Sequence, residues 1–262
     1  MNAFDTALQA WLVHIGSSSF SFTHAVGAVV HFYFTKGVVP LAILCAIWFQ
    51  PGDSQLMRRQ IVVATLCAAL SAFVIGRLLA LTLPFRLRPI YEPSVHLSFP
   101  LSDQTGDEMR LWSSFPSDHA ALWMAIAVGI FSVWRWIGLL AIIHCVVFVC
   151  LPRIYLGLHY PTDVIAGAGI GAFCAWLLTR APIRSRFAPL FLQIMERKPA
   201  AGYMLAFLFF FELATMFEEP RQLAESVLKH MHHSVLHGAH RPTAVHADGV
   251  SATAPRITAA HR

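Results

Sequence analysis

The chain has 262 residues, of which 56% are hydrophobic and 13% charged, and its net charge is +5. Soluble domains carry about 25% charged residues, so the composition excludes an ordinary soluble protein and favours six or seven membrane spans joined by short loops. The basic residues are 16 Arg and only 3 Lys. Arginine suits planar contacts with phosphate or carboxylate groups, although the codon preference of a GC-rich genome produces the same excess.

The first 50 residues contain three apolar segments of different character. Residues 3–15 have one apolar side, which predicts a helix that lies in the membrane interface. That side consists of Phe4, Leu8, Trp11 and Leu12. Residues 20–34 and 37–50 form either two membrane helices or one span with a half-embedded lead-in, and the pattern leaves both open.

Five apolar segments follow in the rest of the chain. The first, 61–83, is interrupted by Arg77 and precedes a polar loop over 85–116. The other apolar segments are 119–134, 137–152, 163–179 and 203–217. Within 163–179, Gly167 and Gly171 have the spacing that allows close packing of one helix on another.

These segments predict an all-α fold, a polytopic membrane helix bundle with six core transmembrane helices and an extra C-terminal helix. The predicted parts are an interfacial helix over 1–19, a membrane core over 20–180, a cytoplasmic loop and extra membrane helix over 181–217, and a His-rich tail over 218–262. The composition of the tail predicts disorder, although its histidines also allow weak binding of a transition metal.

The orientation of the bundle follows from its basic loops. Arg58 and Arg59 precede 61–83, Arg135 follows 119–134, and five further basic residues follow 163–179. All these loops fall on one side if every segment crosses, and the positive-inside rule makes that side cytoplasmic. The loops over 85–118 and 152–162 then share the outer face.

Three polar motifs lie in or beside those two outer loops. The strongest places Arg153, His159 and Asp163 in an Arg-x5-His-x3-Asp array. The other two are Arg86-Leu87-Arg88-Pro89 and Phe115-Pro116-Ser117-Asp118-His119. Two of the motifs begin predicted helices, so free N–H groups and positive helix-dipole ends point to one place, which favours a phosphate.

The side chains of these motifs are those that a phosphate transfer needs. Arg153 can hold an oxyanion, His159 can attack or move a proton, and Asp163 can fix the tautomer of the imidazole. Ser117 adds a hydroxyl donor. The motifs contain no cluster of carboxylates for a metal, so we expect chemistry without a metal or another cofactor.

The three motifs resemble K-x6-RP, PSGH and SR-x5-H-x3-D of the type 2 phosphatidic acid phosphatase (PAP2) and vanadium haloperoxidase superfamily, over roughly residues 37–180. The resemblance implies that His159 attacks phosphorus and becomes a phosphohistidine, while Asp163 orients it and stabilises the charged ring. It also implies that His119 protonates the leaving oxygen and then activates water. The implied holders of the phosphate oxygens are Arg88, Arg153, Ser117 and nearby amides.

The chain departs from the family pattern at two important positions. Leu81 stands where the family has lysine, and Arg77 or Arg86 is the candidate to replace that charge. We favour Arg77, because a charge inside a span is costly and usually serves a function, although snorkelling to the interface is the alternative. Asp118 replaces a glycine, and it either favours the helix N-terminus or engages an arginine. We group Arg77, Arg86 and Asp118 with the predicted phosphate-binding residues.

The resemblance implies an integral phosphatase of the bacterial inner membrane whose active site faces the periplasm or exterior. The expected partners are the bilayer and a lipid substrate, with no nucleic acid, and the sequence leaves the oligomeric state open. Because Ser-Phe-Pro-Ser-Asp-His is similar to the form in undecaprenyl-diphosphate phosphatases, undecaprenyl diphosphate is the preferred substrate. Phosphatidic acid, phosphatidylglycerol phosphate and lipid A phosphates stay open. Two other classes of protein also stay open. One is a vanadate haloperoxidase, although those enzymes are typically soluble, and the other is a non-catalytic lipid-binding protein or transporter with a relic site.

Overall fold

The computed structural model describes residues 2–17, 19–32, 34–100 and 110–217, and the His-rich tail lies outside these ranges. The described residues contain helices and no strand, which confirms the all-α prediction. The helical elements are α1 (Ala3–Ser17), α2 (Phe20–His31), η1 (Phe34–Val38), α3 (Val39–Phe49), α4 (Gln55–Thr82), η2 (Pro89–Tyr91), α5 (Asp118–Val133), α6 (Arg135–His144), η5 (Cys145–Cys150), α7 (Leu151–Tyr155), α8 (Pro161–Leu178), α9 (Ala181–Arg197) and α10 (Pro199–Thr215).

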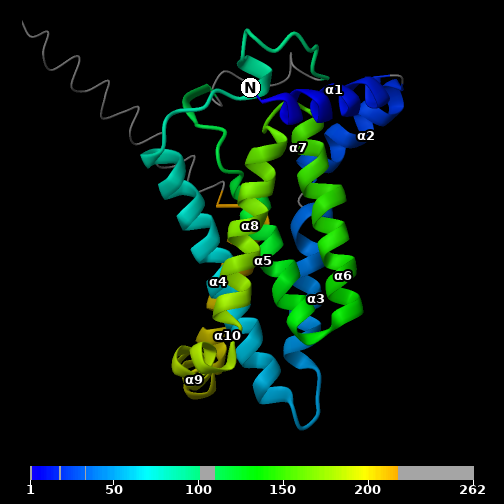
Figure 1. Cartoon of the computed structure of the whole chain (residues 1–262). Coiled ribbons are helices and arrows are strands. Elements are labelled where there is room, and N and C mark those ends of the chain that lie inside the picture. Colours follow the sequence, from blue (N-terminus) through cyan, green and yellow to red (C-terminus); the bar gives the residue numbers. More distant parts are fainter. Residues whose placement is uncertain (1, 18, 33, 101–109, 218–262) are drawn as a thin grey trace, which may run out of the picture. The chain divides into compact units, whose positions relative to one another are not determined.

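The helices α4, α5 and α8 pack against one another, and Figure 1 shows α5 and α8 near the middle of the bundle with α4 along one side. The closest contact is between α8 and α5. A Cβ on Gly167 would lie 2.2 Å from the carbonyl oxygen of Ser117, and one on Gly171 would lie 2.0 Å from that of Ala121. Only glycine permits this approach, so the predicted close packing is confirmed. It holds the helix that carries Asp163 directly against the helix that carries His119.

Three helical segments among the described residues are long and apolar enough to cross a membrane. They are α4, the continuous run of α6, η5 and α7 over Arg135–Tyr155, and α8. The segments Phe20–Val30 and Phe34–Phe49 pass the same test together, but the pair is bent by 65°. The predicted count of six core spans is therefore not confirmed. The helices α5 and α10 are apolar but have 16 and 17 residues, fewer than the roughly 20 that span a hydrocarbon core.

The connection after α8 contains a regular helix where the sequence predicted a loop. Helix α9 covers Ala181–Arg197 and buries Ala188 and Leu192, while its arginines occupy other positions. Spacing of four residues places those two side chains on one face, so the segment is amphipathic and packs against the bundle. Helix α10 follows directly, where the extra C-terminal helix was predicted.

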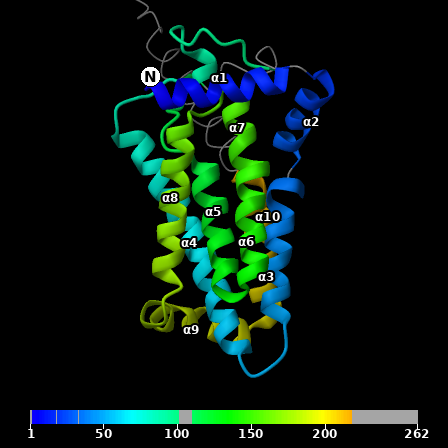
Figure 2. The same cartoon turned by 45° about the vertical axis from the view of Figure 1, so that its right-hand side comes forward.

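Helix α1 lies across one end of the bundle, above α7 and α8 (Figure 2). The predicted helix over 3–15 is thus confirmed as a helix. The basic loops lie at the other end, around the start of α4 and α9 (Figure 2). The end that α1 covers contains the connection from α7 to α8 and the start of α5. The three motifs lie at this end.

Candidate active site

The segment between α7 and α8 holds His159 in a fixed loop. The carbonyl of Arg153 accepts hydrogen bonds from the N–H groups of Leu158 and His159, at 3.0 and 3.2 Å. Gly157 adopts a φ of +70°, and a Cβ there would lie 2.6 Å from the ring of Phe99. The turn therefore requires glycine both for its backbone and for the space around it. His159 ends up only 2% exposed.

Two contacts set the tautomer of the His159 ring. Its Nδ1 lies 2.8 Å from the carbonyl oxygen of Ser114, which can only accept, so Nδ1 carries the proton. Its Nε2 lies 3.3 Å from Nη1 of Arg88, which can only donate, so Nε2 presents its lone pair. Both partners indicate the same neutral ring, with the nucleophilic nitrogen facing a guanidinium.

The surroundings of His159 keep the ring uncharged. Burial, and after it the positive charge of Arg88, lowers the pKa of His159 well below its usual value; Arg153 acts in the same direction and Asp118 opposes it. The ring is therefore neutral around pH 7. A neutral imidazole is the form that can attack phosphorus, so the electrostatics agree with the tautomer.

The carboxylate of Asp163 lies near this ring without a direct hydrogen bond to it. Its Oδ2 accepts from the Ser114 hydroxyl at 2.7 Å and from the Tyr160 N–H at 2.9 Å, and it is 4.0 Å from Nδ1 of His159. Its Oδ1 is paired with Arg86. The predicted direct fixing of the tautomer by Asp163 is thus replaced by the Ser114 carbonyl, while the carboxylate stays close enough to stabilise a positive ring.

A second histidine is held at the start of α5. Oδ1 of Asp118 lies 2.9 Å from Nδ1 of His119, and Oδ2 forms an ion pair of 2.6 Å with Arg77. Asp118 therefore joins the imidazole of His119 to Arg77, which lies within α4. The carboxylate leaves Nε2 of His119 as the nitrogen that can exchange a proton with a substrate or water.

The remaining predicted residues lie at the same end of the bundle but have different contacts. Ser117 is fully buried and caps α5, accepting from the Ala120 N–H at 3.5 Å. Arg86 is paired with Asp163 and with Asp5 rather than with either histidine. Arg88 donates to the carbonyl of Leu158 at 2.8 Å, and its buried Nε has no hydrogen-bond partner among the described residues. A buried donor of this kind suits an anion.

Sequence reasoning missed four residues of this region. They are Ser114, Lys36, Asp5 and Gln9. Lys36 is 6% exposed, donates to the carbonyl of Val30, and its charge acts on His119 together with that of Arg153. Its neighbour Gly37 packs against Trp123, which lies one turn beyond His119 on α5. Lys36 lies between the apolar segments 20–34 and 37–50, and a charge in so apolar a stretch is the signal that could have found it.

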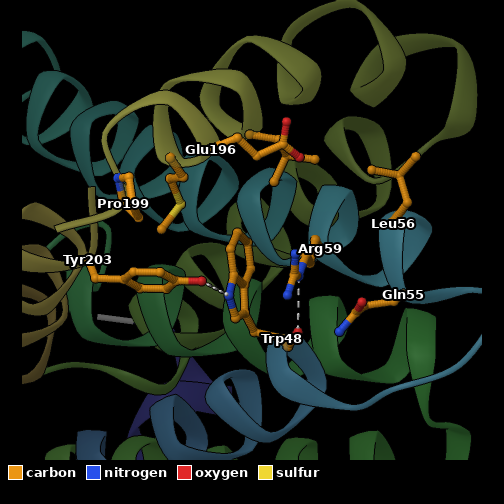
Figure 3. A pocket seen from close by; sticks show the side chains of 9 residues that line it. Trp48, Gln55, Leu56, Arg59, Glu196, Pro199 and Tyr203 are labelled. Atoms are coloured by element: carbon orange, nitrogen blue, oxygen red, sulfur yellow. Dashed lines mark hydrogen bonds between the residues drawn. The ribbon is translucent and has the colours of Figure 1, made fainter. Parts of the chain in front are cut away.

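A separate pocket of about 380 Å³ lies at the other end of the bundle, between α3, α4, α9 and α10 (Figure 3). Its lining includes Trp48, whose Nε1 donates to the Tyr203 hydroxyl at 3.4 Å and whose carbonyl accepts from Arg59 at 3.3 Å. The pocket contains none of the motif residues. Among the described residues, no group of three or more His, Cys, Asp or Glu side chains is arranged to hold a metal.

Fold and site together define an all-helical bundle with apolar, membrane-length helices that gathers two histidines and several arginines at one end. Residues 59–187 match the model of the PAP2 superfamily. The match includes all three motifs. It begins after α3 and ends within α9, so α1, η1 and α10 lie outside it.

Three curated proteins illustrate the relationship. The lipid A 4'-phosphatase of Bacteroides thetaiotaomicron is 40% identical over 65 residues, which are 24% of this chain and 28% of that protein. The lipid A 1-diphosphate synthase of Escherichia coli is 33% identical over 124 residues, 42% of this chain and 47% of that protein. The undecaprenyl-diphosphatase of Sulfolobus acidocaldarius is 38% identical over 65 residues, 24% of this chain and 31% of that protein. The chain thus spans less than half the length of each.

Among solved structures, a transmembrane PAP2-type phosphatidylglycerolphosphate phosphatase from Bacillus subtilis superposes with a TM-score of 0.43. It is 22% identical in sequence, and the superposition covers 66% of this chain and 82% of that one.

Proposed function

We propose that this protein is a membrane phosphatase that hydrolyses a lipid phosphate or diphosphate, without a metal, through a phosphohistidine intermediate. The observation that carries the proposal is the state of His159. Its proton is held on Nδ1 by the Ser114 carbonyl, so the lone pair of Nε2 is available beside the guanidinium of Arg88. The match to the family model and relatives named as lipid A phosphatase and undecaprenyl-diphosphatase support the same chemistry.

In the first step, the Nε2 lone pair of His159 attacks phosphorus while the bond from phosphorus to the leaving oxygen breaks. The hydrogen bond from Arg88 to Nε2 of His159 breaks, and Arg88 instead holds the phosphate oxygens together with Arg153. Charge develops on these oxygens in the transition state. The ring becomes positive as the P–N bond forms, and Asp163, 4.0 Å from Nδ1, stabilises that charge. His119 enters this step as an imidazolium, with one proton on Nδ1 facing Asp118 and a second on Nε2, and it gives the Nε2 proton to the leaving oxygen.

In the second step, His119 takes a proton from water, and the water oxygen bonds to phosphorus. The P–N bond breaks, its electron pair returns to Nε2 of His159, and inorganic phosphate leaves. Asp118 keeps His119 oriented through both steps, since its carboxylate is fixed by Arg77. Asp118 and Arg77 therefore act on His119 in this proposal, rather than on the phosphate.

The preferred substrate is undecaprenyl diphosphate, which would give undecaprenyl phosphate and phosphate. The Ser-Phe-Pro-Ser-Asp-His segment and the relative from Sulfolobus acidocaldarius support this choice. Several positive groups around one site also suit a substrate with more than one phosphate. Phosphatidic acid, phosphatidylglycerol phosphate and lipid A phosphates are the alternatives, and the two lipid A relatives favour the last of them.

We further propose that the short apolar helices α5 and α10 lie within the bilayer beside the membrane-length helices. The basic loops then face the cytoplasm, and the site faces the periplasm or exterior of a bacterial inner membrane. This orientation lets the tail of the substrate stay in the lipid while its phosphate rises between the helices to His159.

The function is tested with the purified full chain in detergent and undecaprenyl diphosphate in the presence of EDTA. We expect release of inorganic phosphate that EDTA does not reduce. Release that EDTA abolishes and magnesium restores would contradict a metal-independent reaction. Phosphatidic acid, phosphatidylglycerol phosphate and lipid A are assayed in parallel to define the substrate. Failure to release phosphate from all four lipids would contradict a lipid phosphatase.

Lys36 offers a second test, because it supplies a buried positive charge while position 81 is an exposed leucine. We expect Lys36→Met to lower kcat/KM by about 10- to 100-fold, the effect of losing one charge-assisted contact at a phosphate site. The matched control is Lys198→Met, at an exposed position beyond α9. Equal kinetics in Lys36→Met and wild type would show that this lysine has no part in binding the phosphate.

A further inference from the structure

Helix α1 buries polar side chains and exposes apolar ones. Asp5 and Gln9, one turn apart, are both fully buried. Phe4, Trp11 and Ile15 are 52, 58 and 52% exposed on a different face. A carboxylate is rarely removed from water unless it is paired, so its partners indicate what the buried face does.

Both oxygens of Asp5 are used by the motif regions. Oδ1 accepts from the backbone N–H of Thr162 at 2.9 Å, and Oδ2 accepts from the Thr162 hydroxyl at 2.9 Å. Thr162 is the second residue of α8, where the helix has no acceptor of its own for this N–H. Asp5 thus caps α8 from another helix, and its negative charge lies at the positive end of the α8 dipole.

Two further contacts join α1 to His159. Arg86 binds Asp5 through Nη2 at 2.8 Å and Asp163 through Nη1, so one guanidinium bridges the two carboxylates. The same guanidinium lies 3.9 Å above the ring of Tyr160. The side-chain amide of Gln9 donates to the backbone carbonyl of His159 itself, at 3.3 Å. Helix α1 therefore holds this region at two points, the carbonyl of His159 and the N-terminus of α8 at Thr162.

We propose that Asp5 is a positioning residue for the attack of His159, and that α1 is a fixed part of the active site. The inference rests on the proposed function. Asp5 touches neither histidine, and Arg86 is occupied by two carboxylates. Asp5 therefore acts by holding the N-terminus of α8, which carries Asp163 in its first turn. Asp5 lies outside residues 59–187, so the family match does not include it.

The proposal predicts an effect on kcat rather than on KM. Misplacement of a nucleophile by about 1 Å can cost a factor of 10², even when the cause lies away from the reacting atoms. We expect Asp5→Asn to lower kcat by about 10- to 100-fold while KM changes less than about threefold. Asp5→Glu keeps the charge for Arg86 and is expected to recover part of the loss. Asp53→Asn, at an exposed position near the other end of the bundle, is the matched control.

Hydrogen–deuterium exchange of residues 156–166 provides a readout that does not depend on activity. We expect faster exchange there in Asp5→Asn, with no change in the central part of α5. Gln9→Ala is measured beside it, since it removes only the contact with the His159 carbonyl and serves if Asp5→Asn does not fold. Unchanged exchange over 156–166 in both variants would overturn the proposal. So would a kcat per folded molecule equal to that of wild type. If wild type hydrolyses none of the four lipids, the proposed function fails, and the exchange result still decides the role of Asp5.

Discussion

Replacing His159 with alanine is expected to lower phosphate release by on the order of 10⁴-fold or more, because the change removes the proposed nucleophile, whose Nε2 faces Arg88. The substrate should still bind, since Arg88 and Arg153 are unchanged. His24→Ala is the control, at an exposed position on α2. Rapid quenching of wild type with labelled substrate should capture phosphate on the protein in a bond that is stable to alkali and labile to acid.

The same variant separates the enzyme from a lipid-binding protein. A His159→Ala variant that releases phosphate at the wild-type rate would exclude His159 as the nucleophile. Labelling that persists in His159→Ala would place the intermediate on another residue. Lipid binding by wild type without any release, and without labelling, would favour a relic site.

Replacing His119 with alanine is expected to lower steady-state turnover by about 10²- to 10⁴-fold, the usual range for loss of a general acid and base. The need for an acid in the first step should depend on the substrate. With undecaprenyl diphosphate the leaving group is undecaprenyl phosphate, whose phosphate oxyanion is stable and needs little help from an acid. With phosphatidic acid the leaving group is the alkoxide of diacylglycerol, which does need the proton of His119.

With undecaprenyl diphosphate, the His119→Ala variant should therefore still form the phosphohistidine but fail to hydrolyse it. Rapid mixing should show a burst of about one equivalent of undecaprenyl phosphate, followed by slow turnover. With phosphatidic acid, both the burst and the turnover should be lost. His24→Ala, at an exposed position on α2, is the control here as well. A burst of equal size with both lipids, or full turnover in the variant, would contradict the role given to His119.

The sequence predicted the helices and the meeting of the motifs at one end, because those features depend on local pattern. Gly167 and Gly171 indicated close packing, and a carbonyl contact at each position confirms it. The six-span count is not confirmed, because composition does not distinguish a buried helix of 16 residues from one that crosses a bilayer. The α5 helix is apolar on all sides since other helices surround it.

The connections within the site depend on contacts between distant parts of the chain. Asp118 was expected to favour the helix end or to engage an arginine, and the structure pairs it with Arg77 and with the neighbouring imidazole. Asp5 and Thr162 are separated by 157 positions, and spacing alone cannot relate them. The imidazole of His159 is held by the backbone carbonyl of Ser114, and a motif of side chains cannot reveal a backbone contact.

The contact of α8 with α5 has a consequence for how the protein tolerates different lipids. At Gly167 and Gly171 the two helices meet backbone to backbone, without side chains that could compress or rearrange. The start of one helix carries His119 and the start of the other follows the His159 loop, so this rigid contact fixes the distance between the proposed acid and the proposed nucleophile. A thinner or thicker bilayer should change the tilt of the other helices, while the distance between His119 and His159 stays the same.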